Sequence, residues 1–212
     1  MNTDGLNEIA DSVRAHLDAK HKAREQALAL SREVIRLSAN AIRAVHRREF
    51  ALAEELIAKG KANLEQTEAG LAVHRDIFHA GFVHDAQKEF AEANCTLALI
   101  AGRTLPTPES LGVMGASYLN GLGETVGELR RHLLDSLRAG DIQHCEDALT
   151  AMGDIMDVIV TMDYPEAVTA GLRRTADAMR AILERTRGDF TMAFAQRHLE
   201  DRIRDFENKL PG

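Results

Sequence analysis

Two pairs of glutamates lie in helical stretches of this sequence at spacings that suit metal binding. Glu89 and Glu92 are three residues apart in GFVHDAQKEFAEAN, and Glu124 and Glu128 are four apart in YLNGLGETVGELRR. Residues three or four apart share one face of a helix, so each pair can present two carboxylates together. Because hard divalent cations prefer oxygen ligands, the two pairs brought together predict a site for Mg²⁺, with Mn²⁺ as a substitute.

Such a site predicts hydrolysis of a phosphodiester, because a cation held by carboxylates keeps water molecules that can attack a phosphorus centre. A di-iron site would need a histidine three residues after a glutamate on two helices. Cys95 and Arg131 stand at those positions, which argues against di-iron chemistry. Each pair also has a purely structural interpretation: a solvated acidic stripe beside Lys88 for the first, and close helix packing with Glu128 paired to Arg131 for the second.

The composition predicts an all-α protein with a single domain over residues 1–212. Aromatic residues make up only 4% of the chain and Trp is absent, while Ala, Leu, Glu and Arg are abundant. These residues favour helices over sheets. From Leu6 to Arg48 no Gly or Pro interrupts the apolar pattern, so we expect one very long helix or two nearly collinear ones, too long to be covered by the core of one subunit. Further helices are expected at 49–74, 81–101, 111–138, 141–162, 165–187 and 189–209, the last one after a break at Gly188.

The helical periodicity places the two pairs differently. The first pair lies beside the apolar stripe of its helix, at the expected edge of the core. The second pair lies opposite a leucine stripe, on a face that periodicity alone assigns to the surface. Gly121, Gly123 and Gly127 lie in the same helix, and each weakens it by about 1 kcal/mol relative to Ala. These glycines predict the close approach of another helix, a subunit or a phosphodiester backbone.

Charge is distributed unevenly along the chain. The net charge is -7, but eight basic and two acidic residues between Lys20 and Arg48 give that segment a charge of +6. Within it, Arg32, Arg36 and Arg43 share one sector of the first helix with Arg47, as phosphate contacts along a groove would require. A solvated face with Glu33 as one partner is the alternative. His74, His79 and His84 recur every five residues and share no helical face, so they favour base stacking or core hydrogen bonds over a zinc site.

Other features narrow the class of protein. No apolar run is long enough to span a bilayer, and the first residues lack the pattern of a signal peptide, so we expect a cytoplasmic protein. The spacing of Cys95 and Cys145 predicts free buried thiols. The sequence contains no P-loop, GxGxxG, HExxH or GxSxG motif, which argues against the common nucleotide, redox and serine-hydrolase sites.

Four blocks of the sequence resemble the translin family in sequence and order. The blocks are ALSREVIRLSANAIRAVHRREFALAEELI, GFVHDAQKEFAEA, LGVMGASYLNGLGETVGELRRHLLDSLRAGD and DYPEAVTAGLRRTADAMRAILERTRGD. The resemblance extends from about Arg24 to Asp189. It implies a seven-helix all-α subunit that assembles into a hollow barrel, commonly an octamer, which binds single-stranded RNA or DNA.

The resemblance also implies catalysis. In this family translin supplies binding, while translin-associated factor X supplies the carboxylates of a Mg²⁺-dependent endoribonuclease. The Glu-x-x-Glu motif of the active subunit matches Glu89 and Glu92. In its YL-x-G-x-x-D-x-x-G-E segment, Glu124 stands in place of the Asp and Glu128 matches the final Glu. The chain therefore resembles the catalytic branch, and the longer side chain at position 124 is expected to alter the metal geometry and the rate.

The family also has a basic, histidine-containing segment that binds nucleic acid, and the matching part of this chain is less basic. The predicted nucleic-acid-binding residues are Arg32, Arg36, Arg43, Arg75, His79 and His84. Together these features predict a homo-oligomeric, Mg²⁺-dependent endoribonuclease. Two alternatives stay open: a non-catalytic oligomer that binds single-stranded RNA or DNA, and an all-α Mg²⁺-dependent nucleotide pyrophosphatase.

Overall fold

The computed structural model describes residues 3–208, and this part of the chain is built from helices joined by turns and loops. The predicted all-α class is confirmed. In chain order the helices are α1 (Leu6–His46), α2 (Phe50–Gly70), α3 (Arg75–Phe78), α4 (Gly81–Ile100), α5 (Pro108–Leu111), α6 (Gly115–Ala139), α7 (Ile142–Ile159), α8 (Glu166–Thr169) and α9 (Leu172–Glu207). None of the described helices has the length and hydropathy needed to cross a membrane. The predicted end of the last helix near Lys209 lies outside the described residues.

The chain divides into two compact units, Met1–Gly121 and Leu122–Gly212. The division falls inside α6, which begins in unit 1 and continues without interruption into unit 2. The single domain expected over residues 1–212 stays a prediction.

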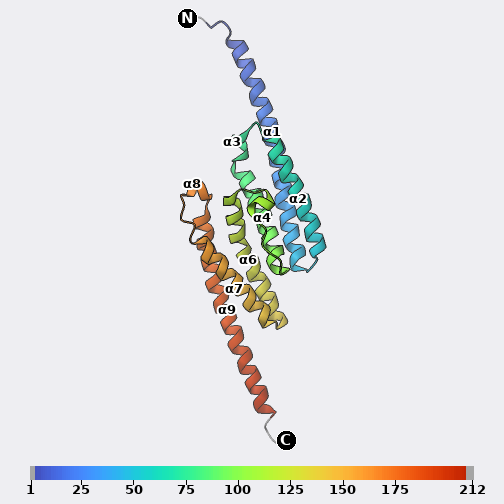
Figure 1. The fold of residues 1–212 in the computed structure, drawn as a ribbon, viewed down its shortest axis with the longest axis vertical. Helices are drawn as coiled ribbons and strands as arrows, with labels where there is room; N and C mark the ends of the chain where they lie inside the picture. Colours follow the sequence, from blue (N-terminus) through green and yellow to red (C-terminus); the bar gives the residue numbers. More distant parts are fainter. Residues whose placement is uncertain (1–2, 209–212) are drawn as a thin grey trace. The chain divides into compact units, whose positions relative to one another are not determined.

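The core of unit 1 holds α1, α2 and α4 together. α1 packs along both α2 and α4, and α2 also contacts α4; Figure 1 shows α1 and α2 running side by side. Phe90 of α4 is 1% exposed and shares an apolar cluster with Val34 of α1 and Leu64 of α2. A second cluster joins Ala27 of α1 to Phe78 of α3. Since burial of an apolar face supplies most of the stability of a helix in a protein, these clusters fix α4, the helix of the first glutamate pair.

The loop predicted after α4 is present, but the following long helix begins later than residue 111. Thr107 caps the short helix α5, because its side chain accepts a hydrogen bond of 3.2 Å from the backbone N–H of Ser110. Gly112 ends α5 with a φ of 71°, in the left-handed region that glycine adopts without strain. α6 therefore begins at Gly115.

The core of unit 2 is built mainly between α6, α7 and α9. Leu133 and Cys145 are both 0% exposed and lie in one apolar cluster. Cys95, in unit 1, is also fully buried, and neither cysteine forms a disulfide. The prediction of free buried thiols is confirmed.

The predicted break at Gly188 is wrong, because α9 is continuous from Leu172 to Glu207. A glycine weakens a helix by about 1 kcal/mol but does not stop it when neighbouring contacts hold both sides. Arg130 of α6 supplies such contacts: it donates to Thr186 Oγ1 at 2.9 Å and to Asp189 Oδ2 at 2.7 Å. The two bonds anchor α9 on either side of the glycine.

The assignment of the glycine face of α6 to the surface is wrong for the first turns of this helix. Ser117 is 0% exposed and Gly121 is buried. A Cβ at Gly121 would lie 2.4 Å from the carbonyl oxygen of Lys88 and 2.9 Å from the backbone N of Glu92, both on α4. The missing side chain therefore lets the backbone of α6 approach the backbone of α4.

The other two glycines of α6 have different surroundings. A Cβ at Gly123 would lie 2.5 Å from Thr175 Cγ2 and 3.0 Å from Met179 Sδ, both on α9. A Cβ at Gly127 would meet nothing within 4 Å. Close helix packing thus explains two of the three glycines, and the structure gives no reason for the third.

We expect opposite effects from adding a methyl group at Gly121 and at Gly127. Gly121→Ala should lower the free energy of unfolding by about 1–3 kcal/mol, because the new Cβ overlaps the backbone of α4. Gly127→Ala should raise it by about 0.5–1 kcal/mol, because alanine is the better helix former where there is space. Urea unfolding followed by helical circular dichroism measures both. Equal stability of the two variants would contradict a tight α4–α6 contact.

Candidate metal centre

Glu89 and Glu92 lie one turn apart on α4, at the edge of the core. The neighbouring Phe90 and Ala93 are 1% and 0% exposed, whereas the side chains of both glutamates are partly buried. The predicted position beside the apolar stripe is confirmed. At this edge the Glu89 side chain remains 28% exposed, while Glu92 is the most buried member of the acidic group described below.

Two contacts fix the start of α6 on α4, and a third joins α6 to the loop that follows α4. The Gln87 Oε1 atom accepts a hydrogen bond of 2.9 Å from the backbone N–H of Met114, just before α6. The Tyr118 hydroxyl donates to the carbonyl oxygen of Pro106 at 2.8 Å. The other contact with α4 is the backbone approach at Gly121. Sequence reasoning gave Gln87 no role, although a glutamine placed on an apolar helical face must find a hydrogen-bond partner once buried, and this one is 3% exposed.

Helix α6 carries Glu124 one turn beyond Gly121. One carboxylate oxygen each of Glu89, Glu92 and Glu124 lies within 4.8 Å of the others. Ligands bound at about 2.0–2.1 Å in an octahedral Mg²⁺ site lie about 3–4 Å apart, so small side-chain rotations would bring these three oxygens to that spacing. This group of acidic residues could hold a metal ion.

Glu128, the fourth predicted ligand, does not belong to this group. Its Oε2 atom lies 3.9 Å from Nη1 of Arg131, and its side chain is 25% exposed. The ion pair with Arg131 given above as the structural interpretation is therefore present. A role for Glu128 as a metal ligand stays a prediction.

Cys95 lies one turn after Glu92 but does not offer a thiolate. Burial raises the pKa of its thiol to about 12, and the charge of Glu92 adds to this shift. Cys95 is not among the residues whose ligand atoms come together at this site. The donors at this site are therefore oxygens, which suit Mg²⁺ or Mn²⁺.

The arginines predicted to bind nucleic acid lie on the exposed face of α1. Arg32, Arg36 and Arg43 are all exposed. Arg36 donates two hydrogen bonds to the carboxylate of Glu33, at 2.8 and 2.5 Å, and these bonds lower the pKa of Glu33. Arg43 donates to the side-chain oxygen of Asn40 at 2.5 Å. The partners are neighbours on the same helix, so the guanidinium groups remain at the surface.

The remaining predicted binding residues lie on a different part of unit 1. Arg75 is exposed on α3, with its guanidinium 4.6 Å from the ring centroid of Phe78, and His79 meets the same ring edge-on at 5.4 Å. His84, in the first turn of α4, has only 15% of its side chain exposed. α3 packs against α1 at Ala27. Arg75 and His79 are therefore accessible, whereas His84 is mostly buried.

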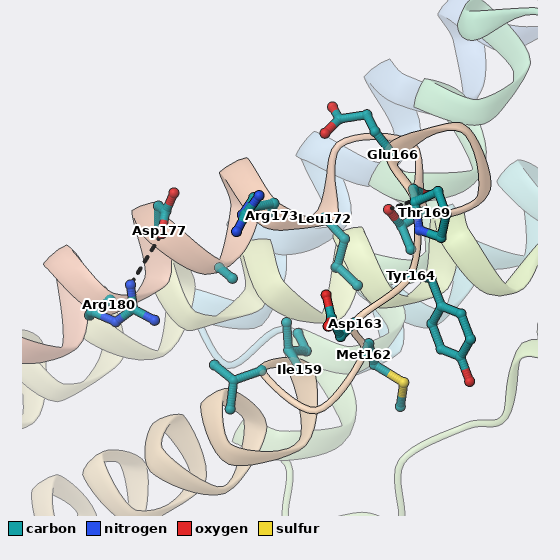
Figure 2. Close-up of a pocket in the computed structure, with 13 residues that line it drawn as sticks. Ile159, Met162, Asp163, Tyr164, Glu166, Thr169, Leu172, Arg173, Asp177 and Arg180 are labelled. Carbon is teal, nitrogen blue, oxygen red and sulfur yellow. Dashed lines mark hydrogen bonds and ion pairs between the residues drawn. The ribbon is translucent and has the colours of Figure 1, made fainter.

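Unit 2 contains a cavity of about 700 Å³ between the end of α7, the segment 160–165, α8 and α9. Ile159 and Leu172 form part of its apolar wall. Figure 2 shows Arg180 joined to Asp177 on α9, at 3.1 Å, with Arg173 nearer the start of the helix. None of the residues predicted for the site lines this cavity. Its mixture of acidic and basic side chains indicates no particular ligand.

The chain was compared with family models and with curated proteins. No family model matches the chain. Among curated proteins, it is 27% identical over 190 residues to the uncharacterized protein MJ0175 of Methanocaldococcus jannaschii, a match that covers 89% of this chain and 84% of that protein.

Solved structures of C3PO proteins are also similar. The crystal structure of AfC3PO is 30% identical with a TM-score of 0.81, covering 89% of this chain and 98% of that one. The AfC3PO–duplex RNA complex is 29% identical with a TM-score of 0.76, covering 89% and 97% of the two chains. Apo-NeC3PO, at 18% identity and a TM-score of 0.73 over 91% and 99% of the chains, shares the fold. By its similarity to AfC3PO over nearly the whole of that chain, this chain belongs to the translin family, as its sequence motifs predicted.

Proposed function

We propose that this chain is a Mg²⁺-dependent endoribonuclease that binds single-stranded nucleic acid as a homo-oligomer. The grouping of Glu89, Glu92 and Glu124 carries the proposal, because three converging carboxylates form an oxygen-only site for a hard cation. The similarity to AfC3PO, which has been solved in complex with duplex RNA, supports RNA as the ligand class.

The three glutamates would hold and orient a divalent cation. When bound, such a cation supplies positive charge to the scissile phosphate and lowers the pKa of a water molecule. Burial, partial for Glu89 and Glu124 and greater for Glu92, restricts the rotamers of these side chains and limits competition from bulk water. A carboxylate within hydrogen-bond reach of the attacking water could also accept its proton, a role that any of the three could fill.

The exposed arginines of α1 would bind the nucleic-acid backbone. Arg32, Arg36 and Arg43 follow one face of a 41-residue helix, so they can contact successive phosphates of an extended strand. Arg75 and His79 add a cation and a ring at α3, where a base could stack. The AfC3PO complex contains duplex RNA, so a preference of this chain for single strands is part of the proposal and needs a direct comparison of both substrates.

An exposed apolar stripe on α1 supports assembly into an oligomer. Leu6, Ile9, Val13 and Leu17 are 59%, 62%, 52% and 55% exposed, and their spacing places them on one helical face. Contiguous apolar surface of this kind marks an interface, and a helix gains most of its stability from packing. A hollow barrel of identical subunits, with an octamer favoured, would supply the missing contact.

A non-catalytic RNA- or DNA-binding oligomer is the second candidate. The ion pair between Lys88 and Glu89 favours it, because a lysine can balance an acidic cluster that has only a structural role. Cleavage assays distinguish this candidate from the nuclease. Release of pyrophosphate from free nucleotides would instead favour the nucleotide pyrophosphatase.

Removal of one carboxylate should strongly reduce the rate of RNA cleavage. A metal ligand contributes several kcal/mol of transition-state stabilisation, so we expect Glu89→Gln to lower the rate of single-stranded RNA cleavage in Mg²⁺ by about 100-fold or more. EDTA should have the same effect on the unmodified protein. Asp85→Asn is the matched control, since Asp85 lies one turn earlier on α4, is 62% exposed and is not in the acidic group. Equal residual cleavage in Mg²⁺, in EDTA and in the Glu89 variant would exclude the nuclease.

Position 124 should tolerate a shorter carboxylate but not an amide. Glu124→Asp keeps an anionic oxygen ligand, so we expect cleavage to continue at a changed rate and with a higher Mg²⁺ requirement. Glu124→Gln keeps the length but loses the charge, and its cleavage rate should fall by about 100-fold or more. Mg²⁺ titrations of the cleavage rate for both variants check this. If the amide variant were the more active of the two, Glu124 would not be a metal ligand.

The exposed arginines of α1, Arg32, Arg36 and Arg43, form an arginine face that should determine how salt affects RNA binding. Arg32→Ala combined with Arg43→Ala should weaken RNA binding and reduce the slope of log K against log salt by about 1 for each phosphate that no longer meets a guanidinium group. Fluorescence anisotropy with a labelled single strand at several salt concentrations measures the slope. Arg187→Ala, which removes an exposed, ion-paired arginine of α9, serves as the control. An unchanged slope in the double variant would place the binding surface elsewhere.

A further inference from the structure

Lys88 lies directly beside the candidate metal centre, and sequence reasoning gave it only a structural role. Its Nζ atom is 3.6 Å from Oε1 of Glu89, and only 20% of its side chain is exposed. Its backbone carbonyl is the atom that a Cβ at Gly121 would meet at 2.4 Å. The close crossing of α4 and α6 therefore holds the base of this side chain in place.

Lys88 is less exposed than two other ion-paired lysines of unit 1. Lys20 and Lys59, which pair with Asp76 and Glu55, have 32% and 59% of their side chains exposed. Withdrawing an ammonium group from water is unfavourable unless nearby anions compensate. Glu89 and the acidic group to which it belongs supply that negative charge.

A divalent cation and the ammonium of Lys88 would need the same carboxylate. Two positive charges a few ångströms apart repel each other, and partial burial weakens the screening by water. A metal bound by Glu89 must therefore share that carboxylate with Lys88 or displace the ammonium. The flexible four-carbon stem of lysine allows such a displacement.

We propose that Lys88 is a charge-balancing residue that neutralises Glu89 while the site is empty and competes with the divalent cation for it. This inference rests on the proposed metal-binding function. Lys88 thereby tunes the metal affinity of the site, so that the carboxylates stay ordered without metal and the cation exchanges readily. The residue lies on the same helix as two of the three ligands, so its effect is local to the site.

The test measures Mn²⁺ binding to the full-length protein in the absence of RNA, by electron paramagnetic resonance or calorimetry. Lys88→Met keeps a similar stem and removes the charge, so we expect its apparent Kd for Mn²⁺ to fall by about tenfold, the effect of removing a modest part of the repulsion between the two cations. Lys88→Arg keeps the charge and should stay close to the unmodified protein. Lys59→Met, which removes an ion-paired lysine on α2, should leave the Kd unchanged.

The outcomes separate this inference from the proposed function. If the unmodified protein and Glu89→Gln show the same absence of Mn²⁺ binding, both are overturned. If the unmodified protein binds Mn²⁺ and Lys88→Met binds it equally well or more weakly, only the competition by Lys88 is overturned. A purely structural role would lower the affinity or leave it unchanged, so tighter binding in Lys88→Met alone supports the inference. Circular dichroism spectra of all variants confirm that they fold.

Discussion

The candidate site depends on the close approach of the α4 and α6 backbones at Gly121. A side chain at this position would overlap the carbonyl of Lys88 and the backbone N of Glu92, so only glycine allows the two helices this proximity. Side chains from closely packed helices can converge over a short distance. Two hydrogen bonds, one from Met114 to Gln87 and one from Tyr118 to Pro106, fix where α6 starts, and helical geometry then determines where Glu124 lies.

The same convergence creates an electrostatic problem. Three carboxylates with oxygens within 4.8 Å of one another repel, and their partial burial reduces the screening that water would provide. Positive charge is therefore needed at this point of the fold. Lys88 supplies one unit of it, and a divalent cation would supply two. Cys95 adds no negative charge, because burial keeps its thiol protonated. The donors of this group are carboxylate oxygens, which suit a hard cation.

Local patterns predicted much of this arrangement because they depend only on residues close in sequence. The spacing of Glu89 and Glu92, the apolar stripe around Phe90 and the extent of α1 all follow from helical periodicity, and the structure agrees with each. What depends on other helices was not predictable in this way. Ser117 lies on a polar face of α6 yet is fully buried by tertiary packing. Gly188 suggests a helix end in the sequence, but Arg130 bonds to Thr186 and Asp189 on either side of it and the helix continues. The family resemblance paired the two acidic segments, whereas periodicity alone could not.

The arginines of α1 differ from the acidic group in that their paired side chains are more exposed. Arg36 and Arg43 bond to neighbours on the same helix, as Arg36 does to Glu33, and exposed pairs of this kind contribute little to stability. A phosphate group can therefore replace these partners at little cost, whereas a ligand at Glu89 must compete with a partly buried ammonium. Weak pairing of the arginines suits sequence-independent contacts along a strand. At Glu89 a small divalent cation would instead compete with the ammonium of Lys88, so strand binding and the proposed metal chemistry depend on different residues.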